Sequence, residues 1–204
     1  MFPAKQIVLL AACCAASPAV ASVTVLDSRA AFRVWGEMMP QTSMVRETFS
    51  TLSQGFTPGS LAGVPAAEAS WQASAVGGLS GANGMLRTLD AGRSMVIEFQ
   101  SGQVRGVGAD FFYSNSMGEA VAGYVVLALA DGTQFVRSVR GMDSFAGFWS
   151  DGAAITRMTI TPIGPAGAAN VLVADDMDIG YVPVPTPGAI ALIAIAAMAG
   201  RRRR

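Results

Sequence analysis

Apolar and polar residues alternate along the chain in two patterns, a short stretch with a helical period and a longer part with a period of two. The helical stretch follows Asp27 and Ser28, which suit a helix N-cap, and it ends at Pro40. Its apolar face holds Phe32, Trp35 and Met39, and its polar face holds Arg29, Arg33 and Glu37. We expect one short helix here, preceded by a first strand over residues 22–26.

From residue 70 onward the period of two predicts a series of short β-strands. Turn signals separate them, at Asn83-Gly84, Asp131-Gly132, Asp151-Gly152 and Gly164-Pro165. The predicted strands cover residues 70–76, 85–89, 94–99, 104–113, 121–130, 133–140, 144–149, 155–161 and 170–179. Many short strands at regular spacing indicate an all-β sandwich. Residues 41–69 are rich in Gly, Pro, Ser and Thr and hold no period, so no strand is predicted there.

Two strands carry further information about their surroundings. Residues 121–130 are apolar on both faces, which predicts a central strand in a sheet covered on both sides. Asp131-Gly132 joins this strand to the next and is the pair that a two-residue type I′ turn demands. In contrast, Met95, Ile97 and Phe99 alternate with Glu98, as expected for a strand with one face in water.

The N-terminus has the features of a secretory signal peptide over residues 1–21. Lys5 supplies the positive charge, an apolar run follows, and Ala19-Val20-Ala21 is a small-x-small cleavage signature that makes Ser22 the first mature residue. Leu10-Ala11-Ala12-Cys13 offers an alternative, a lipobox in which Cys13 is lipidated. Cys13 and Cys14 are the only cysteines, so cleavage after Ala21 leaves a mature fold without disulfides.

Charge and residue types exclude several functions. Between residues 27 and 178 nine arginines face fourteen acidic residues, a net charge of −5, and this acidic body predicts no nucleic-acid partner. The chain has no histidine, and its only lysine is Lys5. These absences exclude Ser-His-Asp triads, Cys-His pairs, Schiff-base lysines and His/Cys zinc sites from the mature body. The "GGLSGANG" stretch lacks the spacing of a phosphate-binding loop and predicts a flexible hairpin loop.

Two chemistries remain open to the residues that are present. The "VADDMDIG" segment places Asp175, Asp176 and Asp178 close together, with Asp110 as a partner from another strand. In a regular strand Asp176 and Asp178 share a face and repel each other unless a cation or separation relieves them, which suggests a structural calcium ion. Paired carboxylates for glycoside hydrolysis are the alternative, and solvated aspartates at a strand end are a third interpretation.

An aromatic run offers a candidate ligand platform. Phe145, Phe148 and Trp149 lie in "SFAGFW" and are suited either to stacking on a sugar or to packing in the core. The core interpretation is favoured, because such a run at a strand edge usually buries its rings. No cofactor is predicted beyond the possible calcium.

The C-terminal residues 183–204 form a separate unit. Pro185 and Pro187 keep "VPVPTP" extended, and residues 188–200 predict an apolar helix about 20 Å long, which is short for a hydrocarbon core of about 30 Å. Arg201, Arg202, Arg203 and Arg204 follow and predict a cytoplasmic stop. A permanent anchor and a core helix are the alternatives to a removable signal.

This tail resembles the PEP-CTERM sorting signal of exported bacterial proteins. The matching residues are Val184, Pro185, Thr186, Pro187 and Gly188, then the helix and the arginine cluster, with Thr186 in place of the Glu that gives the family its name. The resemblance implies recognition by an exosortase, a membrane-embedded protease or transpeptidase. The body over residues 22–182, with "ALADGT" and "ITRMTITP", is similar to jelly-roll-like bodies that precede such tails.

These observations predict an exported protein that passes through the inner membrane and reaches the cell surface or the extracellular space. We expect a non-enzymatic body that binds or structures extracellular polysaccharide. A carboxylate-dependent glycan hydrolase and a purely structural surface protein are the alternatives.

Overall fold

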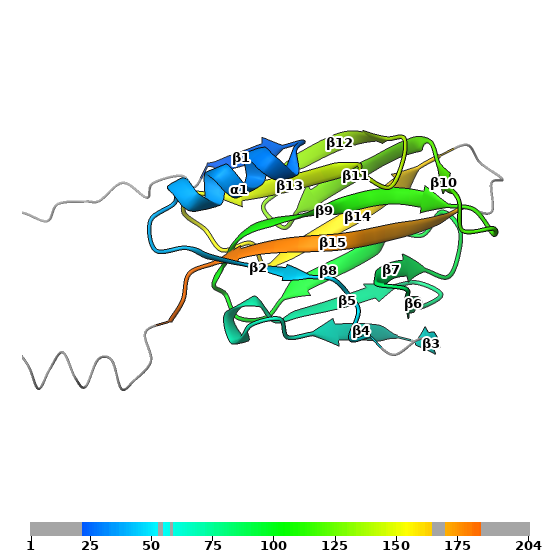
Figure 1. The fold of residues 1–204 in the computed structure, drawn as a ribbon, viewed down its shortest axis with the longest axis horizontal. Helices are drawn as coiled ribbons and strands as arrows, with labels where there is room; N and C mark the ends of the chain where they lie inside the picture. Colours follow the sequence, from blue (N-terminus) through cyan, green and yellow to red (C-terminus); the bar gives the residue numbers. More distant parts are fainter. Residues whose placement is uncertain (1–21, 53–54, 58, 165–169, 185–204) are drawn as a thin grey trace, which may run out of the picture.

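A computed structural model describes residues 22–52, 55–57, 59–164 and 170–184 as two β-sheets packed face to face, with one helix on the outside (Figure 1). The first sheet, sheet A, contains β1 (Val23–Leu26), β2 (Ser43–Glu47), β3 (Gly55–Thr57), β6 (Leu79–Ala82), β7 (Met85–Thr88), β9 (Val104–Ser114), β10 (Ala120–Val121), β13 (Phe145–Ser150) and β15 (Val171–Tyr181). Sheet B contains β4 (Ser60–Gly63), β5 (Trp71–Ala75), β8 (Met95–Phe99), β11 (Gly123–Leu129), β12 (Gln134–Val139) and β14 (Arg157–Ile163). The helix is α1 (Arg29–Met38), and a short 3₁₀ turn, η1, covers Ala67–Ala69.

All strand pairs are antiparallel. Sheet A has the order β1-β13-β9-β15-β7-β6-β3, with β2 beside the second half of β15 and β10 beside the end of β9. Sheet B has the order β12-β11-β14-β8-β5-β4. The two long strands β9 and β15 lie side by side in the middle of sheet A and carry the residues on which the outer layer rests (Figure 1).

The core lies between the inner faces of the two sheets. Alternate residues supply it, such as Phe111 and Phe148 from sheet A and Leu127, Ile97 and Trp71 from sheet B. All five side chains are at most 1% exposed. Because a strand turns successive side chains to opposite faces, this pattern sends the remaining residues of each strand outward.

The β-sandwich predicted from the sequence is confirmed, and each strand predicted from residue 70 onward corresponds to a strand of the structure. The predicted strand over 22–26 corresponds to β1 and the predicted helix to α1. Ser28 occupies the N-cap position, although its side chain makes no capping hydrogen bond. In the stretch where no strand was predicted, the structure has β2, β3 and β4, and within the predicted loop "GGLSGANG" it has β6.

The turn predictions had different outcomes. Asn83 and Gly84 both have positive φ and join the paired residues Ala82 and Met85, as a two-residue type I′ turn requires. The type I′ turn predicted at Asp131-Gly132 is wrong. There only Gly132 has positive φ, and the Leu129 amide donates to the Thr133 carbonyl across a three-residue loop. The Asp131 carboxylate accepts a hydrogen bond from the Thr133 amide at 2.8 Å, which stabilises this longer turn.

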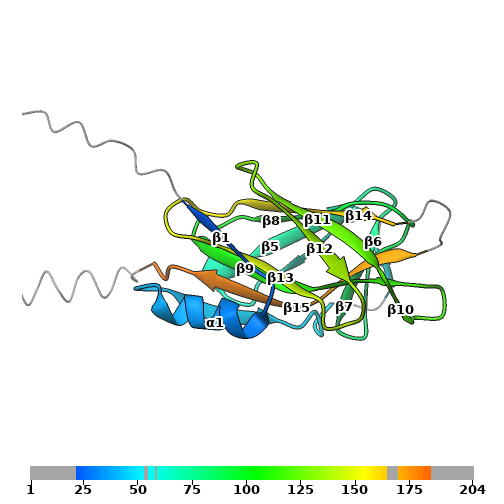
Figure 2. The same cartoon turned by 90° about the horizontal axis from the view of Figure 1, so that it is seen from above.

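The prediction that residues 121–130 are covered on both sides is also wrong. Val125, Leu127 and Leu129 are buried, whereas Tyr124 on the other face is 54% exposed. The strand is second from the edge of sheet B, and α1 packs on sheet A instead (Figure 2). Val126 and Ala128 are apolar but small, and both are partly exposed. Both faces of the strand therefore look apolar in the sequence, although no layer of described residues covers the outer face.

Candidate functional site

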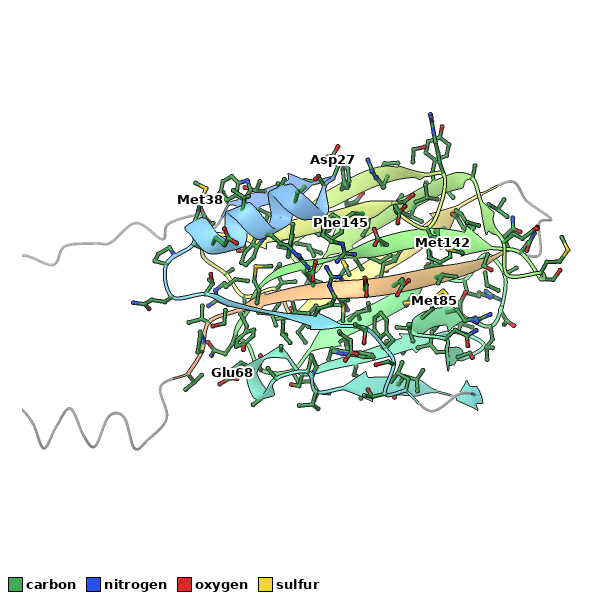
Figure 3. The ribbon with its side chains drawn as sticks, in the orientation of Figure 1. Asp27, Met38, Glu68, Met85, Met142 and Phe145 are labelled. Atoms are coloured by element: carbon green, nitrogen blue, oxygen red, sulfur yellow. The ribbon has the colours of Figure 1, made fainter. Side chains whose placement is uncertain are left out.

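The two outer faces of the sandwich are the surfaces on which a site can be built, and they differ in what covers them. On sheet A, α1 lies across β13 and β9 (Figure 2). Phe32 of the helix contacts the rings of Phe145 and Trp149, with centroids 5.5 and 5.1 Å apart, and the Trp149 indole N–H donates to the Phe32 carbonyl at 2.9 Å. Figure 3 shows Phe145 beside α1. These rings are buried by the helix, which confirms the core interpretation and excludes them as an exposed platform for sugars.

Glycines make room for those rings. A Cβ at Gly106 would lie 2.6 Å from the Trp149 ring, and one at Gly147 would lie 2.9 Å from Phe32. Gly180 and Gly108 face Trp149 and Phe145 even more closely. The sheet therefore presents a flat glycine surface on which the aromatic rings lie, and this surface sets the distance between helix and sheet.

Beside the aromatic rings lies a group of five charged residues, which we name the arginine–aspartate cluster: Arg29, Arg46, Asp110, Asp176 and Asp178. Arg29 donates from Nη1 to Asp178 at 2.5 Å and from Nη2 to Asp110 at 2.6 Å. Arg46 donates from Nε to Asp178 at 2.9 Å and from Nη1 to Asp176 at 3.1 Å. The cluster thereby joins α1 and β2 to the central strands β9 and β15.

A β-bulge in β15 creates this geometry. Asp175 lies opposite Asp110 and Asp178 lies opposite Gly108, so β15 has one residue more than β9 between these positions. Asp176 occupies the extra position with φ of 47°, a left-handed conformation that Asp tolerates. The expectation that Asp176 and Asp178 share a face of a regular strand is therefore corrected: across the bulge it is Asp175 and Asp178 that continue the outer face, whereas Met177 points into the core.

Burial affects the acidity of the carboxyl groups around the bulge. Burial raises the pKa of Asp110, and the hydrogen bond and charge of Arg29 oppose this rise. Burial also raises the pKa of Asp175, and the negative charge of Asp176 adds to the rise. Asp175 therefore lies on the outer face beside the cluster, and the charge of Arg29 offsets its negative charge only in part.

The predicted calcium ligands thus come together with arginines between them. The side chain of Asp178 is 3% exposed and is bound by Arg29 and Arg46. Within the described residues, no group of three or more His, Cys, Asp or Glu side chains has an arrangement that suits a metal ion. The cation that relieves the repulsion in this structure is guanidinium, and calcium at this position stays an untested prediction.

Among the residues that the structure describes, no helix lies on the outer face of sheet B (Figure 2). We name this surface the open face and define it by the outward residues of five strands: Gln72, Ser74, Val96, Glu98, Arg157, Thr159, Thr161, Ile163, Tyr124, Val126, Ala128, Gln134, Val136 and Ser138. Apart from one Arg and one Glu, its polar groups are hydroxyls and amides. Such groups act as both donors and acceptors, as neutral hydroxylated ligands require.

Apolar side chains gather at one corner of the open face. Tyr124 lies opposite Ser138 on β12 and opposite Ile163 on β14. Tyr124, Val136 and Ile163 are 54%, 56% and 49% exposed. An exposed tyrosine ring flanked by aliphatic groups supplies a flat apolar surface with a polar end.

This corner is fixed from below by Tyr113 of sheet A. The Tyr113 hydroxyl crosses the sandwich and donates to the Tyr124 carbonyl, and its ring lies against Gly123. Burial raises the pKa of Tyr113. The backbone that carries the exposed ring is therefore held by a hydrogen bond from the opposite sheet.

The open face continues away from Tyr124 into a groove of about 490 Å³. Ser74, Val96, Ser94 and Arg93 line it together with Val76. Ser94 donates to the Thr161 hydroxyl at 3.1 Å, which connects the groove with the middle of the face. A continuous polar surface therefore joins the exposed tyrosine to a concave end with one arginine.

Sequence reasoning did not identify this site. The available signal lay in residues 121–130, where the side that holds Tyr124 is less apolar than the side that holds Val125 and Leu127. The Ser, Thr and Gln residues of the open face are spread over β5, β14 and β12, and only the pairing of the strands brings them together.

The remaining predicted site residues lie mainly outside the described residues. Ala19 and Ala21 precede them, and Pro185, Thr186, Pro187, Gly188 and Arg201–Arg204 follow them. Ser22 and Val184 are described, and both are exposed. Within the described part of the chain no helix is long and apolar enough to cross a membrane, and the predicted apolar helix over 188–200 falls outside that part.

No family model and no curated protein matches the chain. Among solved structures it is similar to a family 29 carbohydrate-binding module, at 11% identity and a TM-score of 0.38, over 68% of this chain and 88% of that one. It is likewise similar to the family 32 module of C. perfringens NanJ in complex with galactose, at 11% identity and a TM-score of 0.38, over 68% of this chain and all of that one. At these values no function is transferred to this chain.

Proposed function

We propose that the protein is an exported surface or matrix-associated protein whose body binds extracellular polysaccharide through the open face of sheet B. The observation that carries this proposal is the uncovered face itself, on which an exposed Tyr124 ring and rows of hydroxyl and amide side chains lie in register. Sugar rings present apolar C–H faces and hydroxyl edges, and this surface offers a partner for each.

The charge of the face favours a largely neutral polysaccharide. Arg157 on β14 lies opposite Glu98 on β8 in the strand register, so their opposite charges offset each other. Arg93 lines the groove. A nucleic acid would need a cluster of basic residues, which the open face lacks. A flat face joined to a groove favours an extended chain over a single sugar.

A glycan-binding experiment with matched variants tests the proposal. Wild-type protein is screened on immobilised polysaccharides, and affinity for any positive polysaccharide is then measured for Tyr124→Ala and Gln134→Ala. We expect Tyr124→Ala to weaken binding at least tenfold, because loss of one stacking ring costs about 1.4 kcal/mol or more. Met38→Ala removes a large exposed side chain from α1, on the other side of the molecule, and is expected to bind as wild type does. Equal binding by all variants contradicts the proposal.

We further propose that the tail over residues 183–204 directs the protein to an exosortase-type protease, which removes it near Pro185–Pro187. The resemblance of the proline motif, apolar run and arginine cluster supports this. Intact mass of the protein from a host that has its own exosortase is the test. Replacement of Arg201–Arg204 with serines should disturb retention in the membrane. A mature wild-type protein that still carries the arginines would show that the tail is only an anchor.

The body is proposed to be non-catalytic. Hydrolysis of a glycan requires two accessible carboxyl groups, and the cluster carboxylates are bound to Arg29 and Arg46 with Asp178 buried. Release of reducing sugar on incubation with the bound polysaccharide would overturn this part of the proposal.

A further inference from the structure

The described chain begins with a contact that spans 129 residues. The Ser22 backbone nitrogen donates to Oδ1 of Asp151 at 2.7 Å, and the Ser22 hydroxyl donates to Oδ2 of the same carboxylate at 2.7 Å. The Asp151 amide returns a hydrogen bond to the Ser22 carbonyl at 3.1 Å. Ser22 and Asp151 thus form a closed group of three hydrogen bonds.

Strand pairing fixes the position of this group. Ser22 directly precedes β1, and Asp151 directly follows β13, in which Ser150 lies opposite Val23. The carboxylate therefore stands at the end of the β1–β13 pair, where the chain enters the fold. Hydrogen bonds from the Ser22 hydroxyl and the Ser22 amide lower the pKa of Asp151, so this carboxylate is charged at neutral pH.

The nitrogen held by Asp151 belongs to the residue that the sequence predicts as the first of the mature protein. Hydrolysis of the Ala21–Ser22 peptide bond adds water across it, leaving a carboxylate on the released peptide and an amino group on Ser22. Near neutral pH most α-amino groups are protonated, because their ordinary pKa is about 7.7–8.0. An ammonium group with more donors and a full charge would then occupy the position of the amide, 2.7 Å from the carboxylate.

We propose that Asp151 is a binding site for the amino terminus of the mature chain, which it captures as an ion pair once cleavage after Ala21 frees Ser22. The amide–carboxylate hydrogen bond of the precursor becomes a charge-assisted one, which is stronger. Removal of the signal peptide therefore fastens β1 to β13 at the edge of sheet A. This inference is independent of the proposed polysaccharide site.

The composition of the chain makes the test selective. Lys5 is the only lysine, so a chain that begins at Ser22 has a single amine, its own terminus. Exported protein, with its first residue verified by intact mass, is reacted with an amine-reactive ester over a range of pH. Only the unprotonated amine reacts, so the midpoint of the rate profile reports the pKa of the terminus.

We expect the midpoint to lie above the ordinary range in wild type and to return to it in Asp151→Asn, with several-fold slower acylation of wild type at pH 7. Asp176→Asn is the control, because Asp176 lies on β15, which β9 separates from β13, and its carboxylate is bound by Arg46. A second variant retains Ala21 as the first residue and moves the ammonium about 3.8 Å away along the chain.

The stability of these proteins gives a second readout. A group whose pKa is raised in the folded state stabilises the fold below its unfolded pKa and loses this effect as pH rises through the folded pKa. The chain that begins at Ser22 should therefore have a higher Tm than the Ala21 form at pH 6.5, and the difference should vanish well above pH 9. Identical rate profiles for wild type and Asp151→Asn overturn the proposal, and so does an exported chain whose mass shows Cys13 as its first residue.

Discussion

The two outer faces of the sandwich are built from antiparallel strands with the same period of two, yet they have opposite properties. Outward positions on sheet A are glycines, aromatic rings and paired charges, and α1 covers them. Outward positions on sheet B are mostly hydroxyl, amide and β-branched residues, with one Arg, one Glu and an exposed Tyr124, and no helix of the described residues covers them. The outer face of sheet A therefore contributes to stability, whereas the outer face of sheet B is the surface that we propose binds a ligand.

This difference leads to a simple expectation for substitutions. Changes on the outer face of sheet A should alter the free energy of unfolding and spare binding. Changes on the open face should alter binding and leave the free energy of unfolding within about 0.5 kcal/mol, as for most surface positions.

The largest effect is expected in the arginine–aspartate cluster. Asp178→Asn removes the buried charge that Arg29 and Arg46 share, and breaking such a buried pair from one side costs about 3–5 kcal/mol. Asp176→Asn is the matched control, because this side chain is 37% exposed and its pair with Arg46 contributes less than about 1 kcal/mol. Urea unfolding of both variants measures the difference. Equal losses would show that the cluster does not hold the covering layer in place.

Calcium provides a second test of the same cluster. Because guanidinium groups already bind the carboxylate oxygens of Asp110 and Asp178, we expect the wild-type Tm to be the same in a chelator and in millimolar calcium. A higher Tm with calcium would mean that the ion binds the native state, and it would support the metal site suggested by the sequence.

The next effect is expected at the glycine surface. Gly180→Ala would place a Cβ inside the contact distance of the Trp149 ring, and overpacking of this kind costs about 1–3 kcal/mol. Gly141→Ala is a suitable control, because nothing lies within 4 Å of a Cβ at that position. Thermal unfolding distinguishes the two variants. A Gly180→Ala protein as stable as Gly141→Ala would contradict the role of glycine in seating the helix layer.

A smaller effect is expected where the two faces are connected. Tyr113→Phe removes the hydroxyl that reaches the Tyr124 carbonyl from sheet A, at a cost of about 1 kcal/mol. Since this hydrogen bond positions the backbone of the open-face corner, binding should also weaken, although the Tyr124 ring itself is unchanged. Unfolding and binding measured on one preparation check both expectations, and a variant that loses neither would show that the corner needs no support from sheet A.

The smallest effect depends on pH. Burial and the charge of Asp176 raise the pKa of Asp175, so ionised Asp175 opposes folding once the pH rises above that pKa. Asp175→Asn should raise the Tm at pH 7, and the gain should disappear as the pH falls through the raised pKa and the wild-type group becomes protonated. A gain that is constant between pH 3 and pH 7 would assign the effect to something other than ionisation.

The sequence predicted the parts of the fold that depend on local pattern. Met95, Ile97 and Phe99 point into the core as their alternation indicates, and Phe32 faces the sheet as its helical spacing indicates. The Asn83-Gly84 turn follows from the preference of these two residues for positive φ.

The remaining features depend on contacts between distant residues. Glu47 is buried in the region without a period, where it accepts hydrogen bonds from the Phe49 amide and from the Trp71 indole 24 positions away. The bulge at Asp176 shifts the period of β15 by one residue, and no turn residue announces it. Arg29 and Arg46 meet Asp178 only after α1 and β2 have docked, so the sequence showed a set of negative charges but not the cations that neutralise them.

The measurement that tests the central claim most directly is an NMR titration of the isotope-labelled protein with a polysaccharide identified in the binding screen. Amide and side-chain shifts should change on the open face, around Tyr124, Thr159 and Gln134 and on toward the groove at Ser94, while α1 and the arginine–aspartate cluster stay unchanged. Shift changes that gather on α1 or along β15, with none around Tyr124, would contradict the assignment of ligand binding to sheet B.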